Sequence, residues 1–381
     1  MDRIHKLPRS EKASELDDGG YSTYVSNRAG LGSLQTAAGR ATESPERKAR
    51  RSAGFGRWER ELSVGGDHSP VINEPSASDL ELERVFVHLL ALDEDGTRIG
   101  KAIRRTFDML LDGQHTGRYR WEQLHKTEKT HCGTLVEINL QREFDFADGE
   151  VLDYSIEGVE VDCKYSQKLA DWMIPPEASG RILLGLWASD QAGKWSAGLV
   201  RAREENLNPS RNRDAKRTLS RHGRKAIRWL FEKAPLQDNV LLRLADEDID
   251  AIFRSTSGQK RVNELFRRAQ QRPISRNVVA TVAIQEDYMK RVRGNGGART
   301  ALRPEGIVIF GQYRNHVQAA SDLGLPAPGP GESMSVRLAR RQQHHADAAS
   351  IELDGQDWVV AGQNDPPEPG PVLPDIGPLG R

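Results

Sequence analysis

Apolar residues recur at helical spacing from residue 79 onward, after a long stretch that shows no such period. In S-D-L-E-L-E-R-V-F-V-H-L-L-A-L, the apolar stripe starts three residues after Asp79, and aspartate is a common residue at helix N-caps. A second helical pattern covers roughly 98–111. The stretch K-T-E-K-T-H-C-G-T-L-V-E-I-N-L-Q-R-E-F (126–144) predicts a third helix.

Period-two patterns follow the third predicted helix. A turn signal at Glu157-Gly158 joins the first two of these segments and predicts a hairpin. Helices followed by a mostly hairpin-linked sheet indicate an α+β or mixed α/β layer fold. The predicted strands are V-L-D-Y-S-I-E-G (151–158), V-E-V-D-C-K-Y (159–165), R-I-L-L-G-L-W-A (181–188) and W-S-A-G-L-V-R-A (195–202).

A second set of elements follows residues 203–236, which are polar and basic and are predicted to be a linker or helical hinge. Q-K-R-V-N-E-L-F-R-R-A-Q (259–270) has a helical period, and S-R-N-V-V-A-T-V-A (275–283) follows a turn with Pro273. The pair predicts a helix-turn-helix, although the β-branched run leaves the second element open between helix and strand. Strands expected at 305–311, 335–338 and 357–360 would complete a winged arrangement.

Charge divides the chain although its formal net charge is zero. Residues 79–200 hold 14 Lys and Arg against 22 Asp and Glu, whereas residues 201–300 hold 23 against 12. An acidic block before a basic block suits carboxylates that hold metal ions beside a surface that attracts phosphates. Two unrelated solvated surfaces would give the same counts, so both interpretations stay open.

The two cysteines, Cys132 and Cys163, lack metal-ligand spacing and are expected to be reduced thiols of a cytoplasmic protein. No run of about 18 apolar residues occurs, so no membrane span is expected. The first residues lack the apolar core of a signal peptide.

Chemistry is suggested by V-E-V-D-C-K-Y-S (159–166), where Asp162 and Lys164 project from the same side of a strand. The pair is either a weak surface ion pair or the D-x-K core of a metal-dependent nuclease. The predicted hairpin brings Asp153 to the strand beside Asp162, and Glu137 lies on the preceding helix. Phosphodiester cleavage with Mg²⁺ needs such oxygen ligands and a nearby cation, so these four residues are the candidate catalytic set.

Longer motifs resemble the NaeI family of type IIE restriction endonucleases. They run in order from about Leu82 to Val360 and are far more specific than a D-x-K tripeptide. They are Q-L-H-K-T-E-K-T-H-C-G-T-L-V-E-I-N-L-Q-R-E-F (123–144), V-D-C-K, W-A-S-D-Q, V-N-E-L-F-R-R and Y-M-K-R-V-R-G-N-G-G-A-R (288–299).

The resemblance implies a mixed α/β fold with a PD-(D/E)xK nuclease domain followed by an α+β winged-helix-like domain with a helix-turn-helix. It implies Mg²⁺ ligation by Asp153, Asp162 and Glu137, the last directly or through water. Lys164 would position or activate the hydrolytic water. The expected organisation is an N-terminal extension, disordered or mis-called (1–78), the nuclease domain (79–232), a linker (233–240), a DNA-binding effector domain (241–362) and a Pro-rich acidic tail (363–381).

The resemblance also implies the partners. These are double-stranded DNA at two sites, one cleaved and one acting as effector, a second copy of the chain in a homodimer, and a DNA methyltransferase that protects a bacterial host. The family implies the palindrome GCCGGC as the substrate.

Cations and glycines mix in K-R-V-R-G-N-G-G-A-R (290–299), a composition that suits phosphate and base contacts. Residues at the start of a recognition helix usually contact base edges. The predicted DNA-binding residues are Arg276, Asn277, Lys290, Arg291, Arg293, Asn295 and Arg299.

Two other functions compete with cleavage. One is a catalytically silent, regulatory DNA-binding protein, although the carboxylate and lysine set is intact. The other is a topoisomerase-like or repair enzyme, for which the sequence shows no obvious tyrosine nucleophile motif. L-L-D-G (110–113) resembles the K-x-D-G motif of DNA ligases. Leu110 stands where that motif has its nucleophilic lysine, and an apolar side chain cannot form an adduct with AMP.

Overall fold

The structure is a computed structural model that describes residues 79–373. The prediction for residues 1–78, and the part of the predicted tail beyond residue 373, lie outside the described residues.

The three predicted N-terminal helices are confirmed as α1 (Leu80–Leu92), α2 (Thr97–Leu111) and α4 (Lys126–Phe144). Asp79 caps α1, since its carboxylate accepts a hydrogen bond of 3.1 Å from the Leu82 amide. The short segments α3 (Gly113–Thr116) and η2 (Trp121–Gln123) connect α2 to α4.

A six-stranded sheet follows in the strand order β1-β2-β3-β4-β5-β6. Neighbouring strands are antiparallel except β3 and β4, which run parallel and are joined by a crossover that includes η3 (Pro176–Ala178). The strands are β1 (Ala147–Asp148), β2 (Tyr154–Ile156), β3 (Val159–Ser166), β4 (Ile182–Ser189), β5 (Lys194–Arg201) and β6 (Arg228–Pro235).

The prediction of a linker or hinge over 203–236 was wrong. The segment contains η4 (Glu204–Asn206) and α5 (Arg221–Lys225), and it ends in β6, the outermost strand of the sheet. The linker expected at 233–240 therefore begins inside a strand. β6 buries Leu230, Phe231 and Ala234, but it also carries the charged residues Arg228, Glu232 and Lys233, so its composition hides its role.

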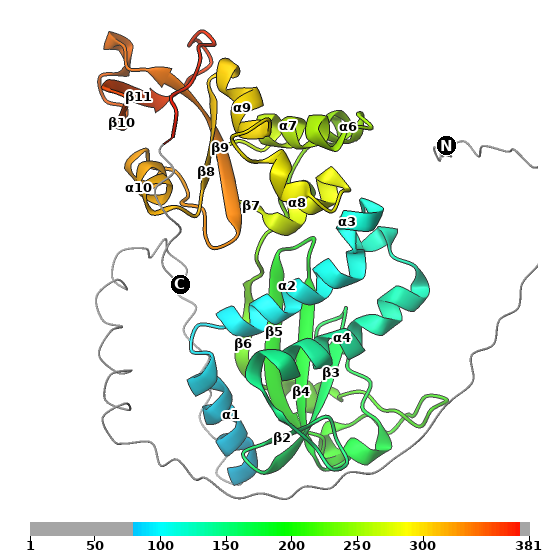
Figure 1. Cartoon of the computed structure of the whole chain (residues 1–381). Coiled ribbons are helices and arrows are strands. Elements are labelled where there is room, and N and C mark those ends of the chain that lie inside the picture. The colour runs from blue at the N-terminus through cyan, green and yellow to red at the C-terminus, as the bar shows by residue number, and fades with distance from the viewer. Residues whose placement is uncertain (1–78, 374–381) are drawn as a thin grey trace, which may run out of the picture. The chain divides into compact units, whose positions relative to one another are not determined.

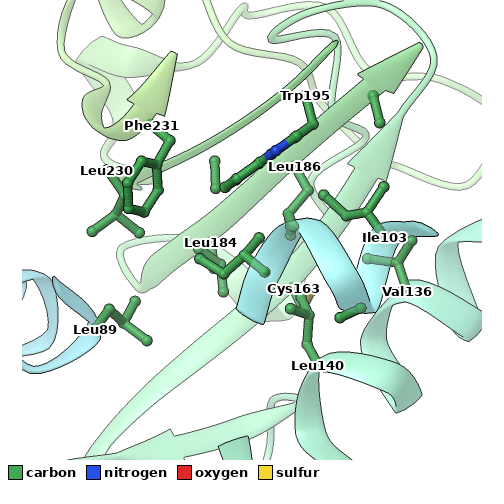
Figure 2. Packing of buried hydrophobic residues seen from close by; sticks show 14 of the residues in the cluster. Leu89, Ile103, Val136, Leu140, Cys163, Leu184, Leu186, Trp195, Leu230 and Phe231 are labelled. Atoms are coloured by element: carbon green, nitrogen blue, oxygen red, sulfur yellow. The ribbon is translucent and has the colours of Figure 1, made fainter. Parts of the chain in front are cut away.

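Helices α2 and α4 lie against the sheet over one apolar core (Figure 1). Leu184 and Leu186 of β4 and Trp195 of β5 point toward Ile103 of α2 and Val136 of α4 (Figure 2). Cys132 and Cys163 are both free thiols buried in this core, as expected for reduced cysteines.

The C-terminal half has its own sheet, ordered β10-β11-β9-β7 with β8 on β9. The second predicted element of the helix-turn-helix is a helix, α8, whose N-cap Ser275 accepts a hydrogen bond from the Val278 amide. The helices are η5 (Val240–Leu242), α6 (Asp246–Phe253), α7 (Gly258–Arg268), α8 (Arg276–Ala283), η6 (Tyr288–Arg291), α9 (Ala298–Leu302), η7 (Arg303–Glu305), α10 (Arg314–Asp322) and η8 (Gln343–His345). The strands are β7 (Ile274–Ser275), β8 (Ile307–Gly311), β9 (Glu332–Arg340), β10 (Ser350–Leu353) and β11 (Gln356–Val360).

The described start of the expected Pro-rich acidic tail, residues 363–373, packs against the C-terminal half. Asp365 is 7% exposed, and Gly370 and Arg303 exchange two hydrogen bonds of 2.9 and 3.0 Å. Backbone and carboxylate contacts of this kind leave no hydrophobic pattern in the sequence. Within residues 79–373, no helix combines the length and apolarity needed to cross a bilayer.

Candidate active site

The β2–β3 hairpin brings two of the predicted acids together. Tyr154 pairs with Val161, so Asp153, immediately before β2, continues the ladder opposite Asp162. The Asp153 carboxylate accepts a 2.7 Å hydrogen bond from the Cys163 amide, which fixes it against β3. The short turn sets this register.

Lys164 lies between the two acids. Its Nζ is 2.7 Å from Asp162 Oδ1 and 3.3 Å from Asp153 Oδ2, and it also donates to the Cys163 carbonyl at 2.8 Å. Burial disfavours the ammonium charge, but the two carboxylates outweigh burial and raise the pKa of Lys164. The amine is therefore held as a cation inside the hairpin.

Asp162 is only 3% exposed. Burial raises its pKa to about 6, against the opposing effect of the Lys164 ammonium. Its second oxygen, Oδ2, is buried and has no hydrogen-bond partner. A buried carboxylate oxygen without a partner is unfavourable unless something else ligates it.

Glu137 approaches from α4 and is half-buried. The Tyr154 hydroxyl donates a 2.7 Å hydrogen bond to the Glu137 carbonyl, which ties the helix to β2. Burial, followed by the charge of Asp153, raises the pKa of Glu137. Sequence reasoning missed Tyr154, for which the one available signal was an aromatic residue next to a candidate acid.

These groups fit a divalent cation of the Mg²⁺ type. The donors are hard carboxylate oxygens from the loop before β2, from β3 and from α4, and the buried Asp162 Oδ2, which has no hydrogen-bond partner, is an oxygen that an ion would satisfy. Glu137 stands further off, since in the described part of the chain only the set His344, His345 and Asp365 offers three ligand atoms within 4.8 Å of one another.

That histidine cluster is a structural contact. His345 Nδ1 accepts the Gln342 amide at 3.0 Å, and its Nε2 lies 3.1 Å from Asp365 Oδ2. If a metal bound Nε2 of a neutral His345 imidazole, the ring proton would have to be on Nδ1. That proton would then clash with the Gln342 N–H, which donates to Nδ1. The His344 side chain is 63% exposed, whereas His345 is only 9% exposed.

Three predicted DNA-binding residues line one hollow of the C-terminal half. Arg276 of α8, Arg293 of the loop before α9 and Arg299 of α9 surround a cavity of about 220 Å³. Asn295 and Arg299 also line a neighbouring cavity of about 540 Å³. Cations from α8 and from the 290–299 segment thus converge there.

The remaining predicted DNA-binding residues do not join this group. Arg291 bonds both oxygens of Asp287 at 3.2 Å and Gln285 at 3.0 Å, and exposed Lys290 lies 3.8 Å from Asp287. Asn277 is half-buried, and its side chain lies near Asp108 of α2, where it favours the charged carboxylate. Six of the eight residues of α8, from Val278 to Ala283, are buried, so most of that helix is covered.

Comparison with known proteins gives the family. Residues 83–369 match the family described as Restriction endonuclease NaeI. The chain is 49% identical over 303 residues to a protein of Lentzea aerocolonigenes named Type II restriction enzyme NaeI, covering 78% of this chain and 95% of that relative. The matched residues contain both sheets, the β2–β3 hairpin and the 290–299 segment, and the chain belongs to the NaeI family of type II restriction endonucleases, site-specific deoxyribonucleases that act on double-stranded DNA.

Proposed function

We propose that the chain hydrolyses both strands of DNA with Mg²⁺ bound at the hairpin. The observation that carries this proposal is the buried, partnerless Asp162 Oδ2 beside Asp153 and Lys164. Asp153 and Asp162 would ligate the ion, and Glu137 would bind it through water. When bound, the ion would polarise the scissile phosphate and lower the pKa of an attacking water.

Lys164 supplies the positive charge of the site. Its ammonium is held by two carboxylates, so it is protonated near neutral pH and serves as a donor that positions the attacking water or a phosphate oxygen. The backbone of Cys163 orients both Asp153 and Lys164: its N–H donates to the Asp153 carboxylate, and its C=O accepts from the Lys164 ammonium. The Cys163 side chain points into the core, and we assign it no chemical role.

The second DNA copy is proposed to bind the hollow lined by Arg276, Arg293 and Arg299. Guanidinium groups suit phosphates and guanine edges. Because most of α8 is covered, we assign DNA contact to the exposed start of that helix and to the 290–299 segment.

We propose that contacts of α8 with α3 and α2 couple the two DNA sites. α3 contacts α8 so closely that a side chain added at Gly113 would place its Cβ 2.0 Å from Thr281 Oγ1. Asp108 lies near Asn277 and accepts a hydrogen bond from the buried Arg104, and Arg104 also bridges to Asp190, the residue after β4. A DNA-induced shift of α8 would reach α2 through these contacts.

Family membership supports three further proposals: the palindrome GCCGGC as the site, a homodimer that cuts the two strands, and a methyltransferase that protects the same site. A bacterial, cytoplasmic location accompanies them. A catalytically silent DNA-binding protein is the alternative that the intact Asp153, Asp162 and Lys164 set disfavours.

Plasmid digestion tests the proposal. The purified chain should give discrete fragments with Mg²⁺ and none with EDTA, with termini inside one repeated hexamer. A short GCCGGC duplex should speed cleavage of a one-site plasmid, whereas a duplex with exchanged central bases should not. Bound but uncut DNA in Mg²⁺ would refute the proposal.

A further inference from the structure

A glutamate beside the proposed site organises the loop that carries Asp153. Glu160 Oε1 accepts the Glu150 amide at 2.8 Å, and Oε2 accepts the Val151 and Leu152 amides at 3.1 and 2.9 Å. Three consecutive backbone N–H groups thus converge on one carboxylate, and the next residue along the chain is Asp153.

The loop has few other supports. Residues 149–153 lie outside any helix or strand, and between residues 79 and 373 no backbone carbonyl accepts a hydrogen bond from these three amides. Leu152 is buried in a small cluster under the sheet, but Val151 is 64% exposed. The carboxylate of Glu160 is therefore the main polar anchor of the segment before Asp153.

The contact requires a carboxylate and a glycine. Successive amides that point at one centre form an anion-binding nest, and charge-assisted hydrogen bonds are stronger than neutral ones. A Cβ at Gly149 would lie 2.3 Å from the Leu152 carbonyl oxygen and 3.1 Å from Glu160 Oε1. A side chain at position 149 would therefore push the loop off the glutamate.

We propose that Glu160 is a positioning residue that sets where Asp153 meets a divalent cation. This inference rests on the proposed function, in which the hairpin binds a divalent cation. Glu160 is two residues before Asp162 on β3. The same strand therefore supplies one proposed ligand, Asp162, and fixes the loop before β2 that carries the other, Asp153. Both of its oxygens are occupied by amides, which makes it an anchor and leaves ligation to Asp153 and Asp162.

The test compares Glu160→Gln with Glu150→Gln in the full chain. Both remove one negative charge from the same loop region, but the exposed Glu150 side chain takes no part in the nest. Divalent-ion affinity is measured by calorimetry with Mn²⁺ in the absence of DNA, and cleavage is measured separately with Mg²⁺. Glu160→Gln should weaken Mn²⁺ binding and cleavage about 10- to 100-fold, as changes to residues that orient metal ligands do. Glu150→Gln should match the wild type.

Gly149→Ala tests the same contact from the loop side and should reproduce the loss. Wild-type Mn²⁺ affinity in either Glu160→Gln or Gly149→Ala would overturn the inference. Asp153→Ala separates the two proposals: if it leaves Mn²⁺ binding unchanged, the metal site itself is wrong. If only Asp153→Ala reduces binding, the site stands and Glu160 has no positioning role.

Discussion

The β2–β3 hairpin and the 290–299 segment both concentrate charge, but they hold it differently. In the hairpin, opposite charges lie within 3.3 Å of one another and are partly buried, and Asp162 and Lys164 influence each other's pKa. In the segment, Lys290, Arg293 and Asn295 are exposed, and Arg291 is held by hydrogen bonds to Asp287. Paired, partly buried charges as in the hairpin suit catalysis at a fixed position. Exposed cations as in the 290–299 segment suit binding to the phosphates of DNA.

The largest expected effect is loss of cleavage in Asp162→Ala or Lys164→Ala. Under the proposed function, each change removes a group that would stabilise the reacting phosphate or its ion, and a thousandfold drop corresponds to about 4 kcal/mol of transition-state stabilisation. DNA binding by gel shift in Ca²⁺ should stay close to the wild type. Near-normal cutting by both variants would contradict the assignment of the hairpin.

A large loss of stability is expected for Asp190→Ala. Arg104 is 6% exposed and donates to both oxygens of Asp190, so the change leaves a buried guanidinium with Asp108 as its remaining acid. Breaking a buried ion pair costs about 3–5 kcal/mol. Urea unfolding measures this, with Asp112→Ala, an exposed aspartate at the end of the same helix, as the control. Equal midpoints for the two variants would exclude a structural role for the pair.

A moderate effect should appear in the pH dependence of stability without metal. The pKa of Asp162 is raised from 3.8 to about 6, so its contribution to folding is complete below 3.8 and is lost as pH rises through 6. Asp162→Asn is neutral throughout and lacks this loss. Its melting temperature relative to the wild type should therefore rise between pH 4 and pH 7 in EDTA. A difference that does not change with pH would contradict the raised pKa.

The smallest expected effect is a change in the salt dependence of DNA binding, which should differ between Arg293 and Arg291 variants. Arg293→Ala should reduce the slope of log affinity against log salt by about 0.9 if it contacts one phosphate of duplex DNA. Arg291→Ala should change the slope less and thermal stability more, because Asp287 and Gln285 already hold its guanidinium. Identical slopes for the wild type and Arg293→Ala would remove that residue from the interface.

Local patterns predicted the hairpin well and the rest of the site less well. Asp153 and Asp162 could be paired from the sequence because a short turn sets their register. The distance to Glu137 depends on how α4 packs, and the nest at Glu160 consists of backbone amides that no side-chain pattern encodes. Composition marked the basic segment but could not show that Arg291 is held by Asp287.

The parts of the fold that the sequence did not predict depend on packing between residues far apart in the chain. β6 is an edge strand that buries few side chains, so its polar composition resembled a linker. Asp365 joins the C-terminal half through His344 and His345, residues about twenty positions earlier in the chain. Tyr119 stacks on Phe253 at 5.9 Å, a contact that only the three-dimensional structure reveals.

Anomalous scattering from a crystal of the full chain soaked in Mn²⁺ tests the metal site most directly. Metal binding at the hairpin predicts a peak about 2.0–2.3 Å from one oxygen of Asp153 and from Oδ2 of Asp162, given the distances usual for small divalent ions. A strong peak at His344, His345 and Asp365 with none in the hairpin would contradict it.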